Sequence, residues 1–321
     1  MPLTKARSNR IPVVEVIEPR AVDSWTHTRS GAPRGYIDAD RLKELWVHTG
    51  TACNLACPFC LEGSHPGDGR IPGMTLSDVK PYFHEALDMG VEQFSFTGGE
   101  PFVIRDFVNI LDYASRHRPC FVLTNATEPL WKRRHQVMPV KNNPYPVHFR
   151  VSLDFPDRAR HDRDRGEGSF DRALEGIRWL IGQGFRVSIA RQTDLNEVPG
   201  EVEARFRVLF REKAIPENLA FTAFPDLGTP GSEDGSPEIT EDCMAKYPTP
   251  ASRAHFMCTY TRMLVKKGER VRVYACTLVD DDSQYDLGGT LAESMSERIM
   301  LRHHRCFACY RFGASCSAPG D

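Results

Sequence analysis

Three cysteines lie within eight residues near the start of this 321-residue sequence, and they are its strongest chemical signal. Cys53, Cys57 and Cys60 have the spacing C-x3-C-x2-C, so their thiolates can converge on one small inorganic cluster. Four thiolates normally complete a four-iron cluster. Three leave one iron without a protein ligand, and an open coordination position is where metal chemistry takes place.

A second cysteine set lies in the last part of the chain. Its members are Cys258, Cys276, Cys306 and Cys309, with the spacing C-x17-C-x29-C-x2-C, followed by Cys316 after six further residues. Four thiols suffice for a fully ligated second cluster. The fifth thiol leaves open which four of them ligate it.

Zinc is the alternative metal that these thiols could bind. The second set could bind a zinc ion, or a zinc ribbon could pair Cys57 and Cys60 with Cys306 and Cys309. The ribbon would leave Cys53 unused and would not explain the turn described below.

The first cysteine set follows the first of six β-rich runs, which alternate with helical stretches. We expect strands at residues 44–50, 94–96, 120–125, 147–154, 185–192 and 219–224, with helices at 75–89, 107–116, 128–137, 170–183 and 201–213. This order is typical of a parallel sheet with helical crossovers, and crossovers of one hand curl such a sheet towards a barrel. Six repeats rather than eight predict an α/β fold with a partial (β/α)6 barrel. The charged stretch 161–169 is expected to be a polar loop.

A turn rich in glycine, Thr97-Gly98-Gly99-Glu100, follows the second expected strand. Glycines allow the backbone to approach another group closely; the simpler interpretation is a tight turn with Glu100 at a helix start. Four more polar residues lie at the ends of later strands: Asn125, Ser152, Asp154 and Arg191. Ligands of α/β folds bind at the carboxyl edge of the sheet, so these are candidate binding residues. The alternatives are loop caps and, for Arg191, a surface salt bridge.

The cysteine loop, the aromatic Phe59 before its third cysteine, and the Gly98-Gly99-Glu100 turn together resemble the radical S-adenosylmethionine (SAM) superfamily. The resemblance covers about residues 45–224. It implies that Cys53, Cys57 and Cys60 hold a 4Fe–4S cluster whose fourth iron is chelated by SAM. It also implies SAM contacts from Phe59, Thr97, Gly98, Gly99, Glu100, Asn125, Ser152, Asp154 and Arg191. One electron would then release a 5′-deoxyadenosyl radical from SAM, and this radical abstracts hydrogen from unactivated carbon.

The C-terminal cysteine spacing resembles the auxiliary-cluster domain, called twitch or SPASM-like, of some members of that superfamily. It is similar to the spacing of 2-deoxy-scyllo-inosamine dehydrogenases. The resemblance implies a second 4Fe–4S cluster held by four of the five thiols. We therefore expect an N-terminal extension (1–43), a radical SAM partial barrel (44–225), a linker (226–250) and a small auxiliary iron–sulfur domain (251–321).

We expect an oxidoreductase that oxidises or rearranges a polar small molecule, with the auxiliary cluster as electron acceptor and an external one-electron reductant, flavodoxin or ferredoxin. The first alternative is a maturase that modifies a ribosomally made peptide. The second is a non-catalytic iron–sulfur or zinc scaffold. The sequence does not single out a general base or a substrate.

The composition limits the partners and the compartment that we expect. Lys plus Arg number 41 against 43 Asp plus Glu, a net charge of −2, which offers no argument for a nucleic-acid or membrane partner. No apolar run reaches the length of a membrane span, and the first residues lack the apolar segment of a secretory signal. We expect a cytoplasmic protein, where clustered thiols indicate metal sites rather than disulfides. The acidic run 280–282 is expected to be a solvated loop.

Overall fold

The computed structural model describes residues 24–193, 197–232, 235–246, 249, 253–313 and 317. Within these residues, one sheet of eight strands has the order β7-β6-β5-β4-β3-β2-β8-β9. Its strands are β2 (Glu44–His48), β3 (Gln93–Thr97), β4 (Cys120–Thr124), β5 (Val147–Ser152), β6 (Arg186–Gln192), β7 (Phe221–Phe224), β8 (Thr261–Lys267) and β9 (Arg270–Tyr274). Neighbouring strands from β7 through β8 are parallel, and only β9 runs antiparallel to its neighbour. The predicted α/β fold with an open, partial barrel is confirmed.

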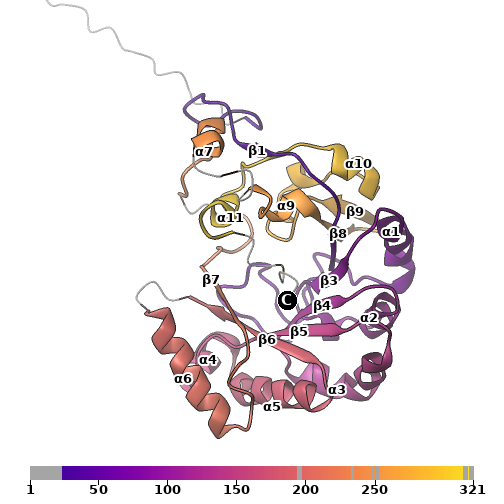
Figure 1. Ribbon diagram of the computed structural model, residues 1–321, viewed down its shortest axis with the longest axis vertical. Helices are drawn as coiled ribbons and strands as arrows, with labels where there is room; N and C mark the ends of the chain where they lie inside the picture. The colour runs from indigo at the N-terminus through magenta and orange to yellow at the C-terminus, as the bar shows by residue number, and fades with distance from the viewer. Residues whose placement is uncertain are drawn as a thin grey trace, which may run out of the picture.

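Helices cross over between the parallel strands and cover the outside of the curved sheet (Figure 1). They are α1 (Leu76–Asp88), α2 (Phe107–Ser115), α3 (Glu128–Val137), α4 (Arg158–Arg165), α5 (Ser169–Gly182) and α6 (Pro199–Glu212), with short 3-10 turns η1 (Pro101–Val103) and η2 (Met138–Asn142). Apolar residues of helices and strands share one core, in which Phe83 of α1 stacks on Phe94 of β3 at 4.3 Å between ring centroids. This burial of the inner helix faces fixes the strand ends that carry the candidate site.

The stretch 161–169 is helical over most of its length, so the prediction of a polar loop there was wrong. Asp157 accepts the Arg160 N–H at 2.9 Å and caps α4, and the helix ends at Gly166, whose φ is +100°. Its single buried residue is His161. The dense charge hid the helix, because it leaves almost no apolar periodicity to detect.

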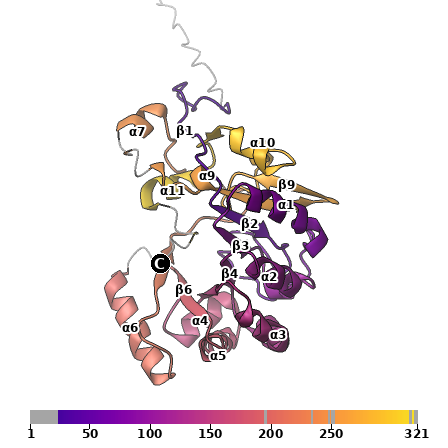
Figure 2. The same cartoon turned by 45° about the vertical axis from the view of Figure 1, so that its right-hand side comes forward.

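The chain after β7 returns to the sheet at its other end. Strand β8 pairs in parallel with β2, so it extends the sheet of the barrel. The remaining elements are α7 (Glu241–Lys246), α9 (Met257–Tyr260), η3 (Ser283–Tyr285), α10 (Leu291–Ser296), β10 (Ile299–Met300) and α11 (Cys306–Phe312). Figures 1 and 2 place α7, α9, α10 and α11 at the end of the molecule opposite α5 and α6.

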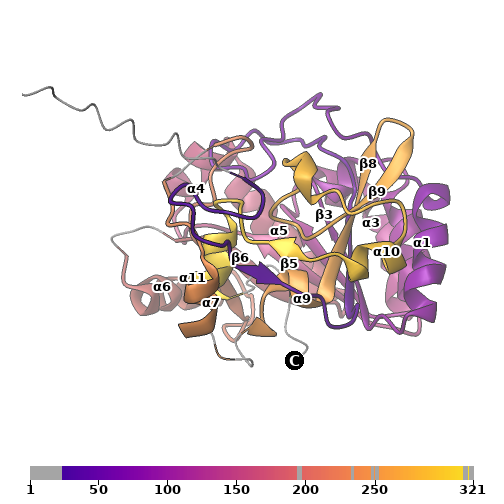
Figure 3. The same cartoon turned by 90° about the horizontal axis from the view of Figure 1, so that it is seen from above.

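The described part of the N-terminal extension lies against this C-terminal segment. Strand β1 (Tyr36–Ile37) pairs antiparallel with β10. Figure 3 views the molecule from that end, and the indigo N-terminal segment crosses in front of the orange and yellow C-terminal elements. A second apolar cluster fills the segment and contains Cys258, Cys276, Cys306 and Cys309. Among the described residues, no helix combines the length and the hydropathy that crossing a bilayer requires.

Candidate functional site

The loop after β2 carries the first cysteine set. Cys53, Cys57 and Cys60 are half-buried free thiols, and the Leu55 N–H points at the Cys53 sulfur at 3.4 Å. Burial raises the pKa of the Cys53 thiol to about 12, and burial also raises the pKa of Cys57. Bare thiolates at Cys53 and Cys57 are therefore costly, and a bound cation centre would offset that cost.

Gly98 and Gly99 let this loop pack directly onto the end of β3. A Cβ on Gly98 would lie 2.6 Å from the Gly50 carbonyl oxygen, and one on Gly99 would lie 2.4 Å from that of Ala52. The Gly99 N–H donates to the Gly50 carbonyl at 2.9 Å, and the Thr97 carbonyl accepts the Thr49 N–H at 2.8 Å. The glycine pair therefore sets the position of the cysteine loop, a role the sequence alone did not reveal.

Glu100 is a buried carboxylate between β3 and β4. Its Oε2 accepts the Asn125 N–H at 2.7 Å, and its Oε1 accepts the Phe102 N–H at 3.1 Å and the Thr124 hydroxyl at 2.9 Å. Burial raises the pKa of Glu100 to about 7, against the effect of these donors. A carboxylate has about four acceptor positions, so one remains for a further donor. Glu100 also caps η1, as the simpler interpretation of the turn proposed.

Asn125 joins β4 to the cysteine loop. Its side-chain N–H groups donate to Asn54 Oδ1 at 3.0 Å and point at the Cys53 sulfur at 4.0 Å. Its Oδ1 accepts from the Thr127 hydroxyl at 2.7 Å and caps the following turn. Both interpretations of Asn125 are thus present at once: it is a loop cap, and it lies at the candidate site.

Asp154 and Arg165 form a buried ion pair beside the cysteine loop. Arg165 Nη2 donates to Asp154 Oδ1 at 3.2 Å, while Arg165 Nη1 lies 4.0 Å from the Cys57 sulfur. The guanidinium also lies 5.4 Å from the centre of the Phe59 ring. Burial opposes the charge, but the Asp154 carboxylate outweighs it and raises the pKa of Arg165. The sequence pattern does not identify Arg165, because the dense charge of its helix predicts a polar loop.

Ser152 and Arg191, the other two residues predicted at strand ends, also lie at the carboxyl edge of the sheet. Ser152 ends β5, is half-buried, and pairs in register with Ala190 of β6. Arg191 is 1% exposed and forms an ion pair with Glu197. The alternative predicted a salt bridge at the surface, and it was wrong about the location, because this salt bridge is buried. Two of its nitrogens, Nε and Nη2, have no hydrogen-bond partner among the described residues. Such buried donors fit an anionic group of a ligand.

The described cysteines of the second set are gathered in one place. Cys258, Cys276, Cys306 and Cys309 are all buried, and burial together with the other three thiols raises the pKa of Cys276 well above its ordinary value. Cys316 lies outside the described residues. Arg262, completely buried in β8, donates to the Cys258 carbonyl at 2.8 Å, and its charge lies near Cys258 and Cys276.

The spacing of the thiols bears on the zinc alternative. In a tetrahedral thiolate site the sulfurs lie about 3.8 Å apart. Among the described residues, the only group of three potential ligands whose atoms all lie within 4.8 Å is His48, Glu62 and Asp280, and it contains no cysteine. A four-iron cluster binds each thiolate at a different iron and so holds the sulfurs farther apart. No three of the described thiols therefore have the spacing of a closed tetrahedral zinc site.

His48, Glu62 and Asp280 connect the cysteine loop to the C-terminal segment. His48 Nδ1 accepts the Gly50 N–H at 3.2 Å, so Nε2 carries the hydrogen and donates to Glu62 at 3.0 Å. Asp280 Oδ2 lies 3.8 Å from the same nitrogen. Burial and the Glu62 charge raise the pKa of Asp280 to about 7. Asp280 is 3% exposed, so the prediction of a solvated acidic loop was wrong for this residue.

Comparison with known proteins agrees with this geometry. The profile of the Radical SAM superfamily matches residues 47–208, just over half of the chain. GTP 3′,8-cyclase of Shewanella denitrificans is 28% identical over 55% of the chain and 51% of its own length. Mycofactocin maturase MftC of Mycolicibacterium smegmatis is 32% identical over 42% of the chain and 33% of its own length. The chain thus spans about half of the first relative's length and a third of the second's.

A solved structure with a similar fold is Streptococcus suis SuiB bound to its precursor peptide SuiA. The TM-score is 0.57 at 17% identity, over 80% of this chain and 65% of that one. This similarity shows the fold alone. The superfamily profile over residues 47–208 shows that the chain belongs to the radical SAM superfamily.

Membership implies a 4Fe–4S cluster and SAM, and the residues fit both groups. Cys53, Cys57 and Cys60 offer three thiols on one loop, Glu100 keeps a free acceptor position for an ammonium group, and Arg191 offers buried donors for a carboxylate. The remaining candidate contacts, Phe59, Thr97, Gly98, Gly99, Asn125, Ser152 and Asp154, lie on the same loop or at the carboxyl ends of β3, β4 and β5.

Proposed function

We propose that this protein is a radical SAM oxidoreductase that oxidises or rearranges a polar small-molecule substrate. Bound at the two cysteine sets, the cofactors would supply a 5′-deoxyadenosyl radical from SAM and an auxiliary 4Fe–4S cluster that accepts an electron. The observation that carries the proposal is the convergence of Glu100, Asn125 and Arg165 on the loop of the three cysteines.

In this proposal the chain positions and shields the reacting groups. Cys53, Cys57 and Cys60 hold the first cluster, and Asn125 and Arg165 direct N–H groups at the sulfurs of Cys53 and Cys57. Such donors stabilise sulfur charge and tune the reduction potential of a cluster. Glu100 would accept from the SAM ammonium and Arg191 would donate to its carboxylate.

Alcohol oxidation is the reaction class that uses a second, fully ligated cluster. The substrate loses a hydrogen atom from carbon, a proton from its hydroxyl group and one electron. The four gathered thiols of Cys258, Cys276, Cys306 and Cys309, with the buried charge of Arg262, support an electron acceptor at that place. A twitch-like or SPASM-like domain over residues 251–321 is part of this proposal, as are flavodoxin or ferredoxin as reductant and the cytoplasm, where thiols stay reduced.

Iron counting and SAM cleavage test the proposal. Anaerobically reconstituted protein is expected to hold roughly eight irons per chain and to form 5′-deoxyadenosine under reduction. Cys53→Ala should abolish 5′-deoxyadenosine formation, and Cys276→Ala should reduce the iron content to roughly four while SAM cleavage persists. Cys243→Ser, at a half-buried thiol of α7, is the matched control and should change neither quantity. SAM binding without any cleavage would favour a scaffold and refute the proposal.

A peptide maturase is the second candidate. MftC is named a maturase, and SuiB is a similar fold solved with a precursor peptide. Incubation with peptides encoded beside the gene, followed by mass spectrometry, distinguishes the two candidates. A mass change in such a peptide would establish this candidate in place of the small-molecule reaction.

A further inference from the structure

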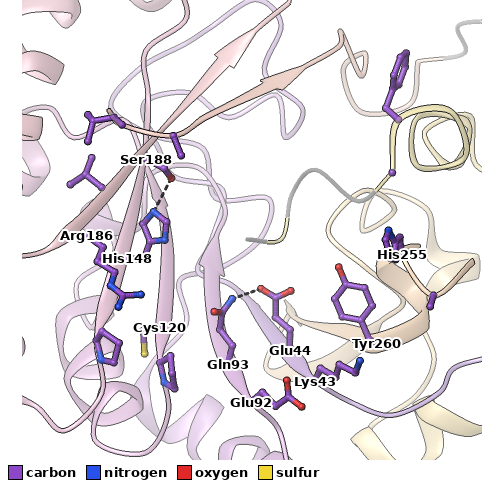
Figure 4. A pocket seen from close by; sticks show the side chains of 18 of the residues that line it. Lys43, Glu44, Glu92, Gln93, Cys120, His148, Arg186, Ser188, His255 and Tyr260 are labelled. Atoms are coloured by element: carbon purple, nitrogen blue, oxygen red, sulfur yellow. Dashed lines mark hydrogen bonds between the residues drawn. The ribbon is translucent and has the colours of Figure 1, made fainter. Parts of the chain in front are cut away.

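A large cavity opens at the edge of the sheet opposite the cysteine loop. It encloses about 1230 Å³ and is lined by the first residues of several barrel strands, including Glu44 of β2, Gln93 of β3 and Arg186 of β6. Tyr260 lies across the cavity, on the C-terminal segment (Figure 4). Phe312 of the same segment also lines the cavity. Glu44 and His48 are the two ends of β2, so the cavity begins about 13 Å below the edge that carries the cysteines.

Glu44 is a buried acidic residue in the wall of this cavity, and its hydrogen-bond donors are neutral. The residue is 4% exposed, although it lines the cavity wall. Its Oε1 accepts from Gln93 Nε2 at 2.9 Å and from the Ser95 hydroxyl, and its Oε2 accepts from the Ser317 hydroxyl. All three donors are neutral.

The charge of Glu44 has no counterion within the described part of the chain. Its hydrogen-bond partners are an amide and two hydroxyls. Burial is the largest influence on the pKa of Glu44 and raises it, and neutral hydrogen-bond donors act against burial. A carboxylate without a counterion is expensive to bury, because neutral donors replace only part of its hydration. A positively charged donor in the cavity would remove this cost and form a stronger, charge-assisted hydrogen bond.

The other acidic residue of the cavity is already neutralised. Glu92 lies at the exposed rim and forms an ion pair with Arg41. His148 and Ser188, on β5 and β6, hydrogen-bond to each other at 2.8 Å across the cavity floor (Figure 4). Glu44 is therefore the acidic group that a ligand cation would meet inside.

We propose that this cavity binds a primary ammonium group of the substrate and that Glu44 is its anionic anchor. The hydroxyl of Ser317 occupies one acceptor position that the ammonium would take. The inference rests on the proposed function because it assumes that the substrate of that reaction enters this cavity. An amino sugar or a peptide lysine could carry this group, and the test separates these two sources.

Equilibrium dialysis of the cluster-loaded protein, without reductant, tests the anchor. Glucosamine is compared with glucose, and the tripeptide Ala-Lys-Ala with its norleucine counterpart. In at least one pair the amine is expected to bind about tenfold more tightly or better than its neutral partner. A preference in the sugar pair alone assigns the site to small amines, one in the peptide pair alone assigns it to peptides, and one in both supports the shared ammonium chemistry.

Two variants, each of which removes one negative charge from the cavity, show which residue causes the preference for the amine. Glu44→Gln should abolish the amine preference, whereas Glu92→Gln should retain it. Equal binding within both pairs to the unsubstituted protein overturns the inference, and this comparison needs no variant to fold. Survival of the preference in Glu44→Gln, or its loss in Glu92→Gln, overturns it as well. Failure to form 5′-deoxyadenosine would count against the proposed function alone, because binding is measured without SAM cleavage.

Discussion

Arg165 lies 4.0 Å from the sulfur of Cys57 and is held there by its buried ion pair with Asp154. The arrangement brings a positive charge from α4 to a thiol that follows β2. The Arg165 charge acts to lower the pKa of Cys57, against the larger effect of burial. Helix α4 is thereby coupled to the electrostatics of the cysteine loop.

Replacing Arg165 with Gln should lower both stability and cluster retention. The change leaves Asp154 buried without its partner, so we expect the free energy of unfolding of the cluster-free protein to fall by about 3 kcal/mol. Urea denaturation measures this loss. Asp154→Asn combined with Arg165→Gln should recover most of the stability but not the iron content. Arg163→Gln, at an exposed position of the same helix, serves as control and should behave like the unsubstituted protein. Recovery of iron content in the double variant would show that the charge beside Cys57 is unimportant.

Replacing Gly99 with Ala should displace the cysteine loop. The added Cβ would lie 2.4 Å from the Ala52 carbonyl oxygen and 2.6 Å from that of Thr51, and backbone atoms cannot move aside cheaply. We expect a loss of stability on the order of 3 kcal/mol and a lower iron content after reconstitution. Gly182→Ala, where the new methyl group meets nothing within 4 Å at the end of α5, is the matched control. Normal iron loading of Gly99→Ala would contradict the role given to the close packing.

SAM binding should depend on the protonation of Glu100. Its pKa is raised to about 7 by burial, so the neutral acid dominates at pH 6 and the carboxylate, which can accept from an ammonium group, dominates at pH 8. Affinity for SAM is therefore expected to increase by up to about tenfold across this range. Isothermal titration calorimetry of the cluster-loaded protein measures the change. Glu100→Gln should bind SAM more weakly and without this pH dependence; an unchanged profile in the variant would assign the titration to another group.

Asp280 should make the protein less stable as the pH rises. Its folded pKa, about 7, lies above the ordinary value of 3.8 because of burial and the nearby Glu62 charge. The stability that this group contributes is complete below the unfolded pKa and is lost as the pH rises through about 7. At pH 8, Asp280→Asn is expected to be more stable than the unsubstituted protein by on the order of 2 kcal/mol, with little difference at pH 4. Urea denaturation at the two pH values tests the sign, and a variant that is less stable at pH 8 would contradict it.

The sequence predicted the barrel well, because its strands and helices carry strong local signals. The helix at 75–89 was recognised by Thr75 and Asp78, which form a reciprocal cap in the structure. Strands β8 and β9 were not predicted. Their place in the sheet depends on a pairing of β8 with β2, more than 200 residues away, and no local pattern reveals such a partner.

The sequence named the cysteines and glycines of the candidate site. It did not predict the contacts that position them. Arg165 and Asp280 were missed because charged stretches usually indicate solvated surface. In the structure Asp280 is buried and Arg165 is largely covered, with its side chain 14% exposed. Arg262 offered a signal that was not used. It directly precedes the apolar run Met263-Leu264-Val265 of β8, and a charge next to such a run is typical of a buried, hydrogen-bonded cation.

The central claim is that the loop of Cys53, Cys57 and Cys60 leaves one iron open for SAM. The direct measurement is electron–nuclear double resonance on the reduced Cys276→Ala variant, in which only the first cluster should remain, with SAM labelled by ¹⁷O in its carboxylate. A hyperfine coupling between the cluster spin and the label is the result that we predict. Absence of that coupling under saturating SAM would contradict the assignment.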